Sequence, residues 1–296
     1  MTVRIATAAY PNTFLESWAD YERKIGEWVA EAANNGAEIL LFPEYGCMEL
    51  ATLAGAATAS DLEASIDAVS QRLGDADALH AELSRRHGVY ICAASGPCRV
   101  EASRRPVNRA RFFAPSGKAG YQDKLVMTRF EREEWNIAAG EQTRVFDTPH
   151  GRIGIAICYD SEFPLVAHAM ADAGAEILLV PSATEALAGY WRVRIGAQAR
   201  ALENQCIAVH APIVGAAEWS PAIDISRGAA GIYCPPDKGF PETGVLAIGK
   251  MDKPGWVYGD VSLDAIREVR ADGNVLNLSD WKFQDERIAD VEIVEL

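Results

Sequence analysis

The chain has 296 residues, of which 49% are hydrophobic and 24% are charged, as expected for a folded globular protein. Its 28 lysines and arginines against 42 aspartates and glutamates give a formal net charge of −14. This charge repels phosphate backbones. The composition therefore excludes disorder as the main state and argues against nucleic acid as a partner.

The cysteines and the chain start indicate the cellular compartment. None of the six cysteines forms a C-x-x-C pair, and a chain of this size needs no disulfides to build a core. The N-terminal residues enter a strand-like segment without the apolar stretch of a signal peptide. Nowhere do about 18 apolar residues follow one another, as a membrane span requires. We expect reduced thiols in a cytosolic protein that does not contact membranes.

Apolar runs, helical periodicity and turn residues predict alternating strands and helices. In the first half the predicted elements are strand 4–10, helix 18–34, strand 39–43, helix 61–87, strand 89–94 and hairpin 109–124. In the second half they are strand 152–159, helix 164–173, strand 177–181, helix 190–205 and strand 206–214. A short apolar strand without alternation is buried on both faces, and a helix between two such strands implies a crossover connection.

One segment occurs twice. The sequence from Gly36 to Pro43 recurs from Gly174 to Pro181 with seven of eight positions identical. Each copy follows an Ala-rich helix, and each helix follows a strand that begins Arg-Ile. A single short repeat is also compatible with a common helix-to-strand junction. However, a matching strand and helix precede each copy, and this favours a duplicated architecture. We therefore predict two packed sheets flanked by helices.

The chain is predicted to hold one domain followed by a tail. No low-complexity linker interrupts residues 1–265, so this range is expected to fold as one unit. Residues 266–296 are polar with apolar anchors, among them Trp281 and Phe283. We expect this tail to pack on a neighbouring subunit.

Three reactive side chains stand where predicted strands end. Glu44 follows an apolar strand, Lys124 closes the hairpin, and Cys158 lies on the turn from a buried strand into a helix. Backbone N–H groups at such a turn lower the pKa of a thiol. Taken alone, each residue has an ordinary structural explanation: a turn glutamate, a solvated edge lysine and a buried thiol.

Together the three residues match the needs of nucleophilic catalysis. A cysteine nucleophile requires a base and an oxyanion stabiliser. None of the five histidines lies in a suitable context. A glutamate base at Glu44 and a cation at Lys124 would fill both roles beside Cys158.

These residues resemble the nitrilase, or carbon-nitrogen hydrolase, superfamily, whose members hydrolyse amides, nitriles and related C–N bonds. The resemblance covers about residues 3–265 and implies a four-layer α/β fold, an αββα sandwich of two mixed sheets. It implies that Glu44 acts as base, that Cys158 forms a thioester, and that Lys124 with the backbone N–H of Tyr159 holds the oxyanion. The matching motifs, in order, are Leu41-Phe42-Pro43-Glu44, Tyr121-Gln122-Asp123-Lys124-Leu125 and Ile157-Cys158-Tyr159-Asp160.

The resemblance also implies a second glutamate shortly after the lysine. Glu131, Glu133 and Glu134 are candidates, and the family spacing to Gly140 selects Glu133. A one-residue loop difference would select Glu134 instead. On a helical turn residue 133 points away from 131, so only one of these faces can look toward the cysteine. A solvated charged face is the usual explanation for such a run.

Substrate choice in the family depends on the pocket lining. The corresponding residues here are Met48, Trp135, Ser182 to Glu185 and Trp191, although aromatic residues are at least as often core as pocket. No subfamily pattern is recognised, so amides, nitriles and N-carbamoyl compounds all remain open as substrates. An amidase is favoured because most branches of the family act on amides.

Two other classes of function remain open. A metal-dependent phosphoesterase of similar sandwich fold would use Glu44 as a metal ligand, but the nearest further candidate, at Ser279 to Trp281, lacks the histidine. A non-catalytic scaffold is the second alternative. No metal, nucleotide or other cofactor is expected, because phosphate-binding loops and zinc-binding clusters are absent from the sequence.

The prediction is therefore an amidase-type hydrolase that releases ammonia or an amine from a small linear or aryl-substituted amide. The family resemblance further implies a homodimer or larger homo-oligomer. Its interface would involve the helices near Phe163 to Met170 and Tyr190 to Ala201.

Overall fold

The structure is a computed structural model that describes residues 2–285, 287–288 and 290–296. Within these residues, seven strands form a first mixed sheet in the order β15-β1-β2-β3-β5-β4, with β6 paired to β5. Strands β1, β2 and β3 run parallel, and the other neighbours are antiparallel. The strands are β1 (Thr2–Ala9), β2 (Ile39–Leu41), β3 (Tyr90–Cys92), β4 (Gly96–Cys98), β5 (Val107–Phe113), β6 (Ala119–Asp123) and β15 (Gly255–Ser262).

The second sheet has six strands in the described part of the chain, in the order β14-β13-β10-β9-β8-β7. Strands β8, β9 and β10 are parallel to one another. The strands are β7 (Val145–Thr148), β8 (Gly151–Ile155), β9 (Ile177–Ser182), β10 (Ile207–Pro212), β13 (Gly231–Tyr233) and β14 (Val245–Ile248). A separate ribbon pairs β11 (Gly215–Ala216) with β12 (Ile225–Ser226).

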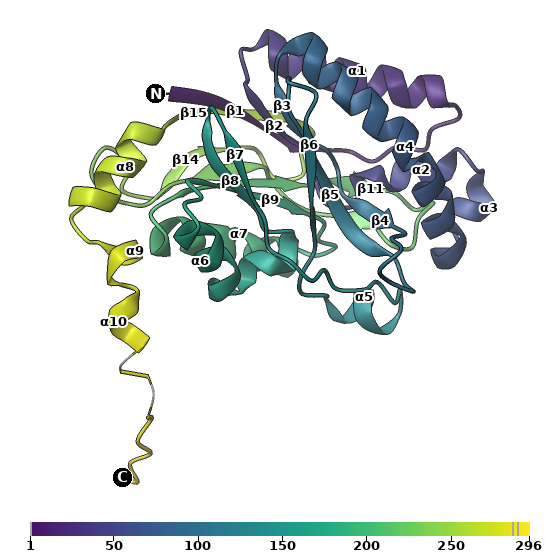
Figure 1. Ribbon diagram of the computed structural model, residues 1–296. Helices are drawn as coiled ribbons and strands as arrows, with labels where there is room; N and C mark the ends of the chain where they lie inside the picture. The colour runs from purple at the N-terminus through teal and green to yellow at the C-terminus, as the bar shows by residue number, and fades with distance from the viewer. Residues whose placement is uncertain (1, 286, 289) are drawn as a thin grey trace.

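Helices cover the outer faces of both sheets (Figure 1). Helices α1 (Trp18–Asn34) and α4 (Leu62–His87) lie on the first sheet, and α6 (Pro164–Asp172) and α7 (Leu187–Glu203) lie on the second. The shorter helices are α2 (Glu49–Thr52), α3 (Ala56–Ala59), α5 (Arg129–Glu133), α8 (Leu263–Asp272), α9 (Asn277–Asp280) and α10 (Lys282–Asp285), with 3-10 turns at Gly46–Met48 and Cys158–Glu162. The predicted αββα sandwich is confirmed.

Alternation along the strands explains the layers. In β1, Val3 and Ile5 pack in the core between the sheets, together with Ile155 and Leu179 of the second sheet. Successive side chains of a strand point to opposite faces. The intervening residues, such as Ala6, therefore pack with the helix layer instead.

The sequence also sets the limits of the long helices. The Ser17 hydroxyl accepts a hydrogen bond from the Asp20 N–H and caps α1, whose buried residues fall on one face. Those residues are Tyr21, Ile25, Val29 and Ala32. Helix α4 begins after the N-cap Asp61 and ends at Gly88, which has a φ of +68°. Glycine adopts this left-handed conformation at little cost.

The repeated segment occupies equivalent places in the two sheets. Ile5 of β1 pairs with Ile39 of β2, and Ile153 of β8 pairs with Ile177 of β9 in the same register. The order strand, helix, strand is therefore shared by β1-α1-β2 and β8-α6-β9. This arrangement agrees with the predicted duplication.

The predicted tail begins as part of the domain. In α8, Ile266 and Val269 are buried in the chain's own core. The Arg270 guanidinium donates hydrogen bonds to the backbone oxygens of Ala175, Asn204 and Gln205. Residues 266–272 therefore pack within their own chain. Further along, the Trp281 ring stacks on His168 with centroids 3.9 Å apart, and residues 290–296 extend away from the body (Figure 1).

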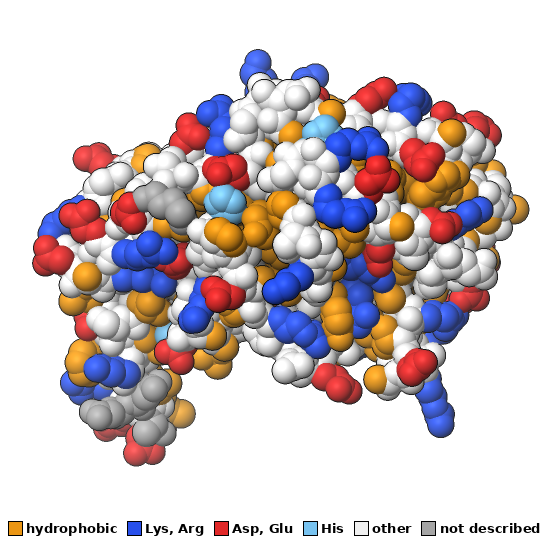
Figure 2. All heavy atoms as spheres, turned by 45° about the horizontal axis from the view of Figure 1, so that its top comes forward, with side chains coloured by type: hydrophobic (Ala, Val, Ile, Leu, Met, Phe, Trp, Pro, Cys, Tyr) orange, Lys and Arg blue, Asp and Glu red, His pale blue; other side chains and the backbone are white. Residues whose placement is uncertain are grey.

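Charges of both signs are spread over the surface. Figure 2 shows acidic and basic side chains interspersed over one face of the molecule. Ion pairs join several of them, such as Arg99 with Asp67 at 2.5 Å. No helix among the described residues combines the length and the apolar character that crossing a bilayer would need.

Candidate active site

The three predicted catalytic residues follow strands of both sheets. Glu44 comes shortly after β2, Lys124 directly follows β6, and Cys158 opens the 3-10 turn after β8. Both Tyr45, next to Glu44, and Cys158 have positive φ values, of 54° and 49°. Non-glycine residues in this region are strained and cluster at functional sites. Sharp turns therefore aim the carboxylate and the thiol into the space where the two sheets meet.

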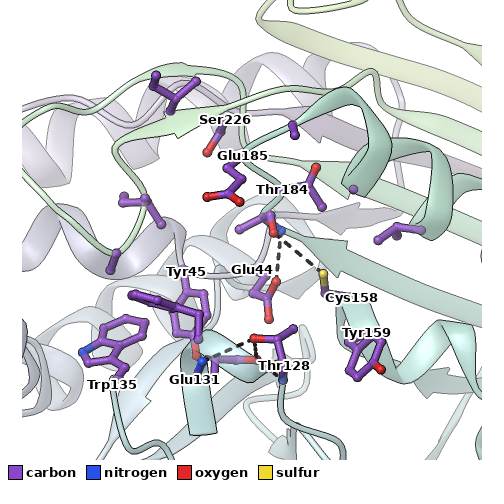
Figure 3. Close-up of a pocket in the computed structure, with 18 of the residues that line it drawn as sticks. Glu44, Tyr45, Thr128, Glu131, Trp135, Cys158, Tyr159, Thr184, Glu185 and Ser226 are labelled. Atoms are coloured by element: carbon purple, nitrogen blue, oxygen red, sulfur yellow. Dashed lines mark hydrogen bonds between the residues drawn. The ribbon is translucent and has the colours of Figure 1, made fainter. Parts of the chain in front are cut away.

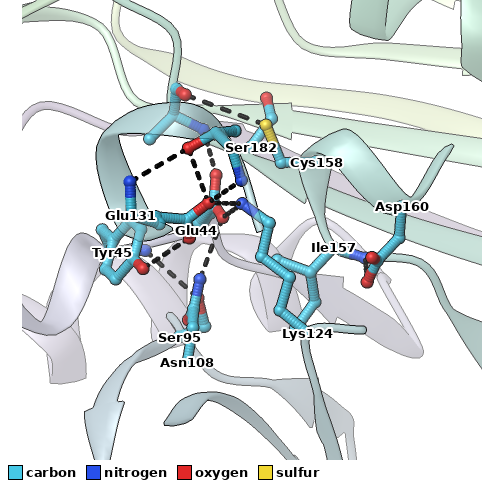
Figure 4. Close-up of polar contacts among 12 residues, drawn as sticks. Glu44, Tyr45, Ser95, Asn108, Lys124, Glu131, Ile157, Cys158, Asp160 and Ser182 are labelled. Carbon is cyan, nitrogen blue, oxygen red and sulfur yellow. Dashed lines mark hydrogen bonds and ion pairs between the residues drawn. The ribbon is translucent and has the colours of Figure 1, made fainter. Parts of the chain in front are cut away.

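A buried ion-pair network joins Lys124 to Glu44 and Glu131 (Figure 4). The Lys124 ammonium donates to Glu44 Oε1 at 2.8 Å and to Glu131 Oε2 at 2.6 Å. All three side chains are at most 3% exposed. Glu44 also accepts from Asn108 Nδ2 at 2.9 Å and, through Oε2, from the Ala183 N–H at 3.0 Å. Buried charges of this kind are tolerated only when they are paired and fully hydrogen-bonded.

The thiol completes the group. Cys158 is 5% exposed, and its Sγ lies 3.8 Å from the Ala183 carbonyl oxygen, to which it donates. Ala183 thus contacts the carboxylate through its N–H and the thiol through its carbonyl. This one residue therefore links the Glu44 carboxylate to the Cys158 thiol.

The structure places Glu131, and not the predicted Glu133, beside Lys124. Glu133 is 44% exposed and pairs with Arg129 at 2.9 Å, so its placement in the site was wrong. The cause is the start of α5, where Thr128 is the N-cap and Glu131 the third helical residue. Glu131 reaches back to the Thr128 N–H at 2.9 Å and turns toward the lysine. The Thr-x-x-Glu capping box was visible in the sequence and would have selected Glu131.

A tyrosine secures the same glutamate. The Tyr45 hydroxyl donates to Glu131 Oε1 at 2.6 Å, and Lys124 and Thr128 bind Oε2. Glu134, the other open candidate, is exposed and lines the mouth of the cavity. The second carboxylate of the network is therefore Glu131.

The environments of the two carboxylates separate their pKa values. Burial raises the pKa of Glu44 above its usual value, although Lys124 opposes this shift. Burial acts in the same direction on Glu131, but Lys124 and the hydrogen bonds from Lys124 and Tyr45 outweigh it and lower the pKa of that carboxyl. When two neighbouring carboxyl groups have different pKa values, the one with the higher pKa can accept a proton while the one with the lower pKa stays ionised. Glu44 is suited to accept a proton, and Glu131 is suited to remain charged.

The pKa values of the lysine and the thiol are both raised. Burial disfavours the charge of Lys124, but Glu44 and Glu131 hold its pKa well above the usual value. Burial, followed by the negative charge of Glu44, raises the pKa of Cys158 well above the usual value for a thiol. The sequence led us to expect the opposite shift from the backbone N–H groups of the turn. The resting thiol is therefore protonated and needs a base to ionise.

A buried aspartate connects the lysine loop to the nucleophile turn. Asp160 accepts hydrogen bonds from the backbone N–H groups of Leu125, Val126 and Ile157 at 2.8–3.3 Å. Burial raises the pKa of Asp160 to about 7. Because Leu125 follows Lys124 and Ile157 precedes Cys158, this carboxylate fixes both loops. No role for Asp160 was predicted from the sequence.

A cavity of about 550 Å³ opens beside the thiol, and Glu44, Lys124, Glu131 and Cys158 all line it (Figure 3). Two of the residues that the sequence singled out, Trp135 and Tyr159, line it. The Trp135 ring is fully buried against Tyr45, with centroids 4.8 Å apart, and its indole N–H donates to the Leu62 carbonyl at 3.0 Å. This ring is a rigid wall of the cavity.

Three other predicted lining residues lie elsewhere. Trp191 is 44% exposed on α7, where its neighbours Arg192 and Val193 face the cavity instead. Successive helical residues differ by about 100° in direction, which accounts for the difference. Ser182 is buried, and its hydroxyl pairs with His210 Nε2 at 2.7 Å. Met48 is part of the core under the first sheet. None of the three lines the cavity.

One wall of the cavity was not predicted from the sequence. Residues 221–226, which include β12, line the cavity beside Thr184 and Glu185, two residues that the sequence had placed there. This wall is assembled from loops with no recognisable motif. Only the structure brings it to the site.

The arrangement around Glu44 does not suit a metal. No group of three or more potential ligands among the described residues could hold a metal ion. Moreover, both oxygens of Glu44 already accept hydrogen bonds, one of them from the Lys124 ammonium. A cation thus occupies the place next to Glu44 where a metal ion would have to bind.

Comparison with known proteins agrees with this geometry. The family model for carbon-nitrogen hydrolases matches residues 4–270. The probable hydrolase YhcX of Bacillus subtilis is 34% identical over 278 residues, which cover 94% of this chain and 53% of that protein. The chain therefore spans about half the length of this curated relative.

Solved structures share the fold. A carbon-nitrogen hydrolase from Helicobacter pylori has a TM-score of 0.77 at 17% identity, covering 98% of this chain and 99% of that chain. An amidase from Nesterenkonia, in a mutant form with the acetamide moiety of fluoroacetamide added covalently at its active-site cysteine, has a TM-score of 0.68. It is 20% identical, and the match covers 97% of each chain.

Proposed function

This chain belongs to the carbon-nitrogen hydrolase family of the nitrilase superfamily, and we propose that it is an amidase that cleaves the C–N bond of a small amide through a thioester on Cys158. The observation that carries this proposal is the buried contact of Lys124 with both Glu44 and Glu131 in the cavity that Cys158 lines. The Nesterenkonia amidase, whose active-site cysteine carries the covalently added acetamide moiety of fluoroacetamide, supports the choice of an amide.

In the first half of the reaction, Glu44 accepts the proton of the Cys158 thiol, and the thiolate attacks the amide carbon. The Lys124 ammonium and the backbone N–H of Tyr159 stabilise the negative oxygen that forms. Glu44 then passes the proton to the amide nitrogen, the C–N bond breaks, and ammonia or an amine leaves. The acyl group remains on sulfur as a thioester.

In the second half, Glu44 accepts a proton from a water molecule, and the resulting hydroxide attacks the thioester carbon. The C–S bond breaks, the carboxylic acid leaves, and the proton on Glu44 returns to sulfur. The raised pKa of Glu44 supports its role as proton carrier. Glu131 stays ionised, keeps Lys124 charged and in place, and does not exchange protons.

The test is a panel of amides, N-carbamoyl amino acids and nitriles, assayed for both ammonia and acid. Mass spectrometry of the enzyme mixed with a slow substrate should detect the acyl group on Cys158. The Cys158→Ala variant should form neither product nor adduct. Cys234→Ala is the control, because Cys234 is equally buried but does not line the cavity. Hydrolysis by Cys158→Ala, or an adduct on another residue, would overturn the proposal.

We also propose that the protein forms a homodimer or larger homo-oligomer through α6 and α7. Large apolar side chains are exposed on these helices, and Leu187, Trp191 and Ile195 follow one another at four-residue spacing on α7. Exposed apolar stripes of this kind mark interaction surfaces. An active monomer at micromolar concentration, detected by analytical ultracentrifugation, would contradict this assembly.

The unpaired state of the six cysteines in the structure supports a reducing, cytosolic location.

A further inference from the structure

The cavity beside Cys158 is lined by more carboxylates than cations. Among the described residues, six lining side chains are acidic and two are basic, a formal charge of −4. The acidic residues are Glu44, Glu131, Glu134, Glu162, Glu185 and Asp224, and the basic residues are Lys124 and Arg192. A concave site lined by one sign of charge concentrates ligands of the opposite sign.

Both cations of the cavity are already paired. Lys124 binds Glu44 and Glu131 at 2.8 and 2.6 Å. The Arg192 guanidinium lies 3.5 Å from Glu162. In the described part of the chain, the cavity therefore offers no unpaired cation to a substrate carboxylate.

Glu185 is the lining carboxylate best placed to take a ligand. It has no hydrogen-bond or ion-pair partner among the described residues. In Figure 3 its carboxylate points into the cavity, across from Trp135 and Glu131 and beyond Glu44. A substrate bound at Cys158 can therefore extend toward it.

The backbone before Glu185 is fixed relative to the reacting groups. The Ala183 N–H donates to Glu44 at 3.0 Å. Thr184 exchanges two hydrogen bonds with Arg227: its carbonyl accepts from the Arg227 N–H at 2.8 Å, and its hydroxyl donates to the Arg227 carbonyl at 3.0 Å. Glu185 is thus attached to a segment that also positions the base.

We propose that the substrate is an amide with a cationic group, an ammonium or a guanidinium, remote from the scissile C–N bond, and that Glu185 determines this specificity by binding it. The inference rests on the proposed function. The cationic group of the substrate would offset the negative charge of the side chains that line the cavity, and it would form a charge-assisted hydrogen bond with Glu185. A carboxylate at the same position would meet unpaired negative charge, which selects against acidic amides.

Three linear amides of equal length, ending in an ammonium, a methyl or a carboxylate group, test the proposal. Ammonia release gives kcat/KM for each. The ammonium-ended amide should exceed the methyl-ended one by about tenfold, and the carboxylate-ended one should be the slowest. Added salt should reduce the preference, because Glu185 is exposed to solvent.

Two variants separate Glu185 from the general acidity of the protein. Glu185→Gln should raise KM for the ammonium-ended amide about fivefold relative to the methyl-ended amide. Glu242→Gln removes an exposed carboxylate that does not line the cavity, and it should leave the order and the ratios of the three amides unchanged. An unchanged ratio in Glu185→Gln would overturn the role of this residue.

The outcomes also separate this inference from the proposed function. Faster hydrolysis of the methyl- or carboxylate-ended amide would overturn the substrate class and leave the amidase proposal intact. If no amide releases ammonia and no adduct forms on Cys158, the amidase proposal fails. Calorimetry on Cys158→Ala would then still decide the charge preference. Tighter binding of the ammonium-ended amide supports it, and equal affinity for the ammonium- and methyl-ended amides overturns it.

Discussion

The two copies of the repeated segment end in different chemistry. The first copy leads from β2 into Glu44, which binds Lys124. The second copy leads through Ser182, the last residue of β9, into Ala183. The Ser182 hydroxyl forms a hydrogen bond with His210 Nε2. Burial lowers the pKa of His210 to about 3, so this imidazole stays uncharged. The same backbone therefore carries a reactive turn in one half and an inert turn in the other.

The two turns nevertheless meet. The Ala183 N–H from the second copy donates to the Glu44 carboxylate of the first at 3.0 Å. Cys158, which follows the strand next to the second copy, donates to the carbonyl of the same alanine. The duplication thus supplies matched strand ends, and the site depends on the differences between the residues that follow them.

The largest expected effect is at the nucleophile. Cys158→Ala should lower turnover by about 10⁴-fold or more, because the thiol is the only side chain that forms the covalent intermediate in the proposed scheme. Thermal unfolding should show an intact fold. Near-normal activity in this variant would show that Cys158 is not the nucleophile.

The next effect concerns the base and the cation. Glu44→Gln and Lys124→Ala should each cost about 10²-fold or more in kcat. The double variant should lose much less than the product of the two, because the residues act as one unit. Steady-state kinetics of the four proteins measures this coupling. If the loss of kcat in the double variant equalled the product of the two single losses, this would count against a shared site.

A matched pair in α5 tests the position of the second carboxylate. Glu131→Gln should lower kcat about 10- to 100-fold, because an anion against the Lys124 ammonium is lost. Glu133→Gln should stay within about twofold of wild type, since its ion pairs are exposed. Equal, mild effects at both positions would show that Glu131 has no part in the mechanism.

The pH profile should report the buried acids. As the pH falls through about 7, Asp160 takes up a proton, and its new O–H faces backbone donors where an acceptor is needed. Glu44 also loses its capacity as a base when it is protonated. We therefore expect kcat/KM to fall toward acid pH. In Asp160→Asn the activity should be low at all pH values, and the part of the acid limb near 7 should disappear.

The smallest expected effect lies in the inert turn. Ser182→Ala removes one buried hydrogen bond and should lower the free energy of unfolding by about 1 kcal/mol. Denaturant titration measures this change. Because Ser182 does not line the cavity, kcat/KM should change little. A large loss of activity without a loss of stability would show that the second copy also contributes a side chain to catalysis.

Much of this molecule was predictable because its strands and helices carry strong local patterns. The limits of α1 and α4 follow from Ser17, Asp61 and Gly88, which cap the helices in the expected way. The three strand-end residues were found because β2, β6 and β8 are short and end in clear turns. Such features depend on neighbours in sequence alone.

The errors have a different origin. Family spacing placed the second carboxylate at Glu133, whereas the helix start at Thr128 determines which glutamate turns inward. Similarly, Trp191 was assigned to the pocket by its position in the chain, although the rotation of α7 turns it outward. The wall formed by residues 221–226 depends on contacts between distant segments. The capping box at Thr128 is a local pattern that could have selected Glu131, whereas the direction of Trp191 and the packing of residues 221–226 are set by tertiary contacts.

The protonated state of the buried thiol has a consequence for chemical labelling. All six cysteines are buried, and Cys158 is ionised only when Glu44 takes its proton. General alkylating reagents should therefore modify the native protein slowly and with little preference among its thiols. An electrophile shaped like an amide would sit against Lys124 and recruit Glu44 to generate the thiolate. Covalent probes for this protein should therefore gain their selectivity from resemblance to the substrate and not from intrinsic reactivity.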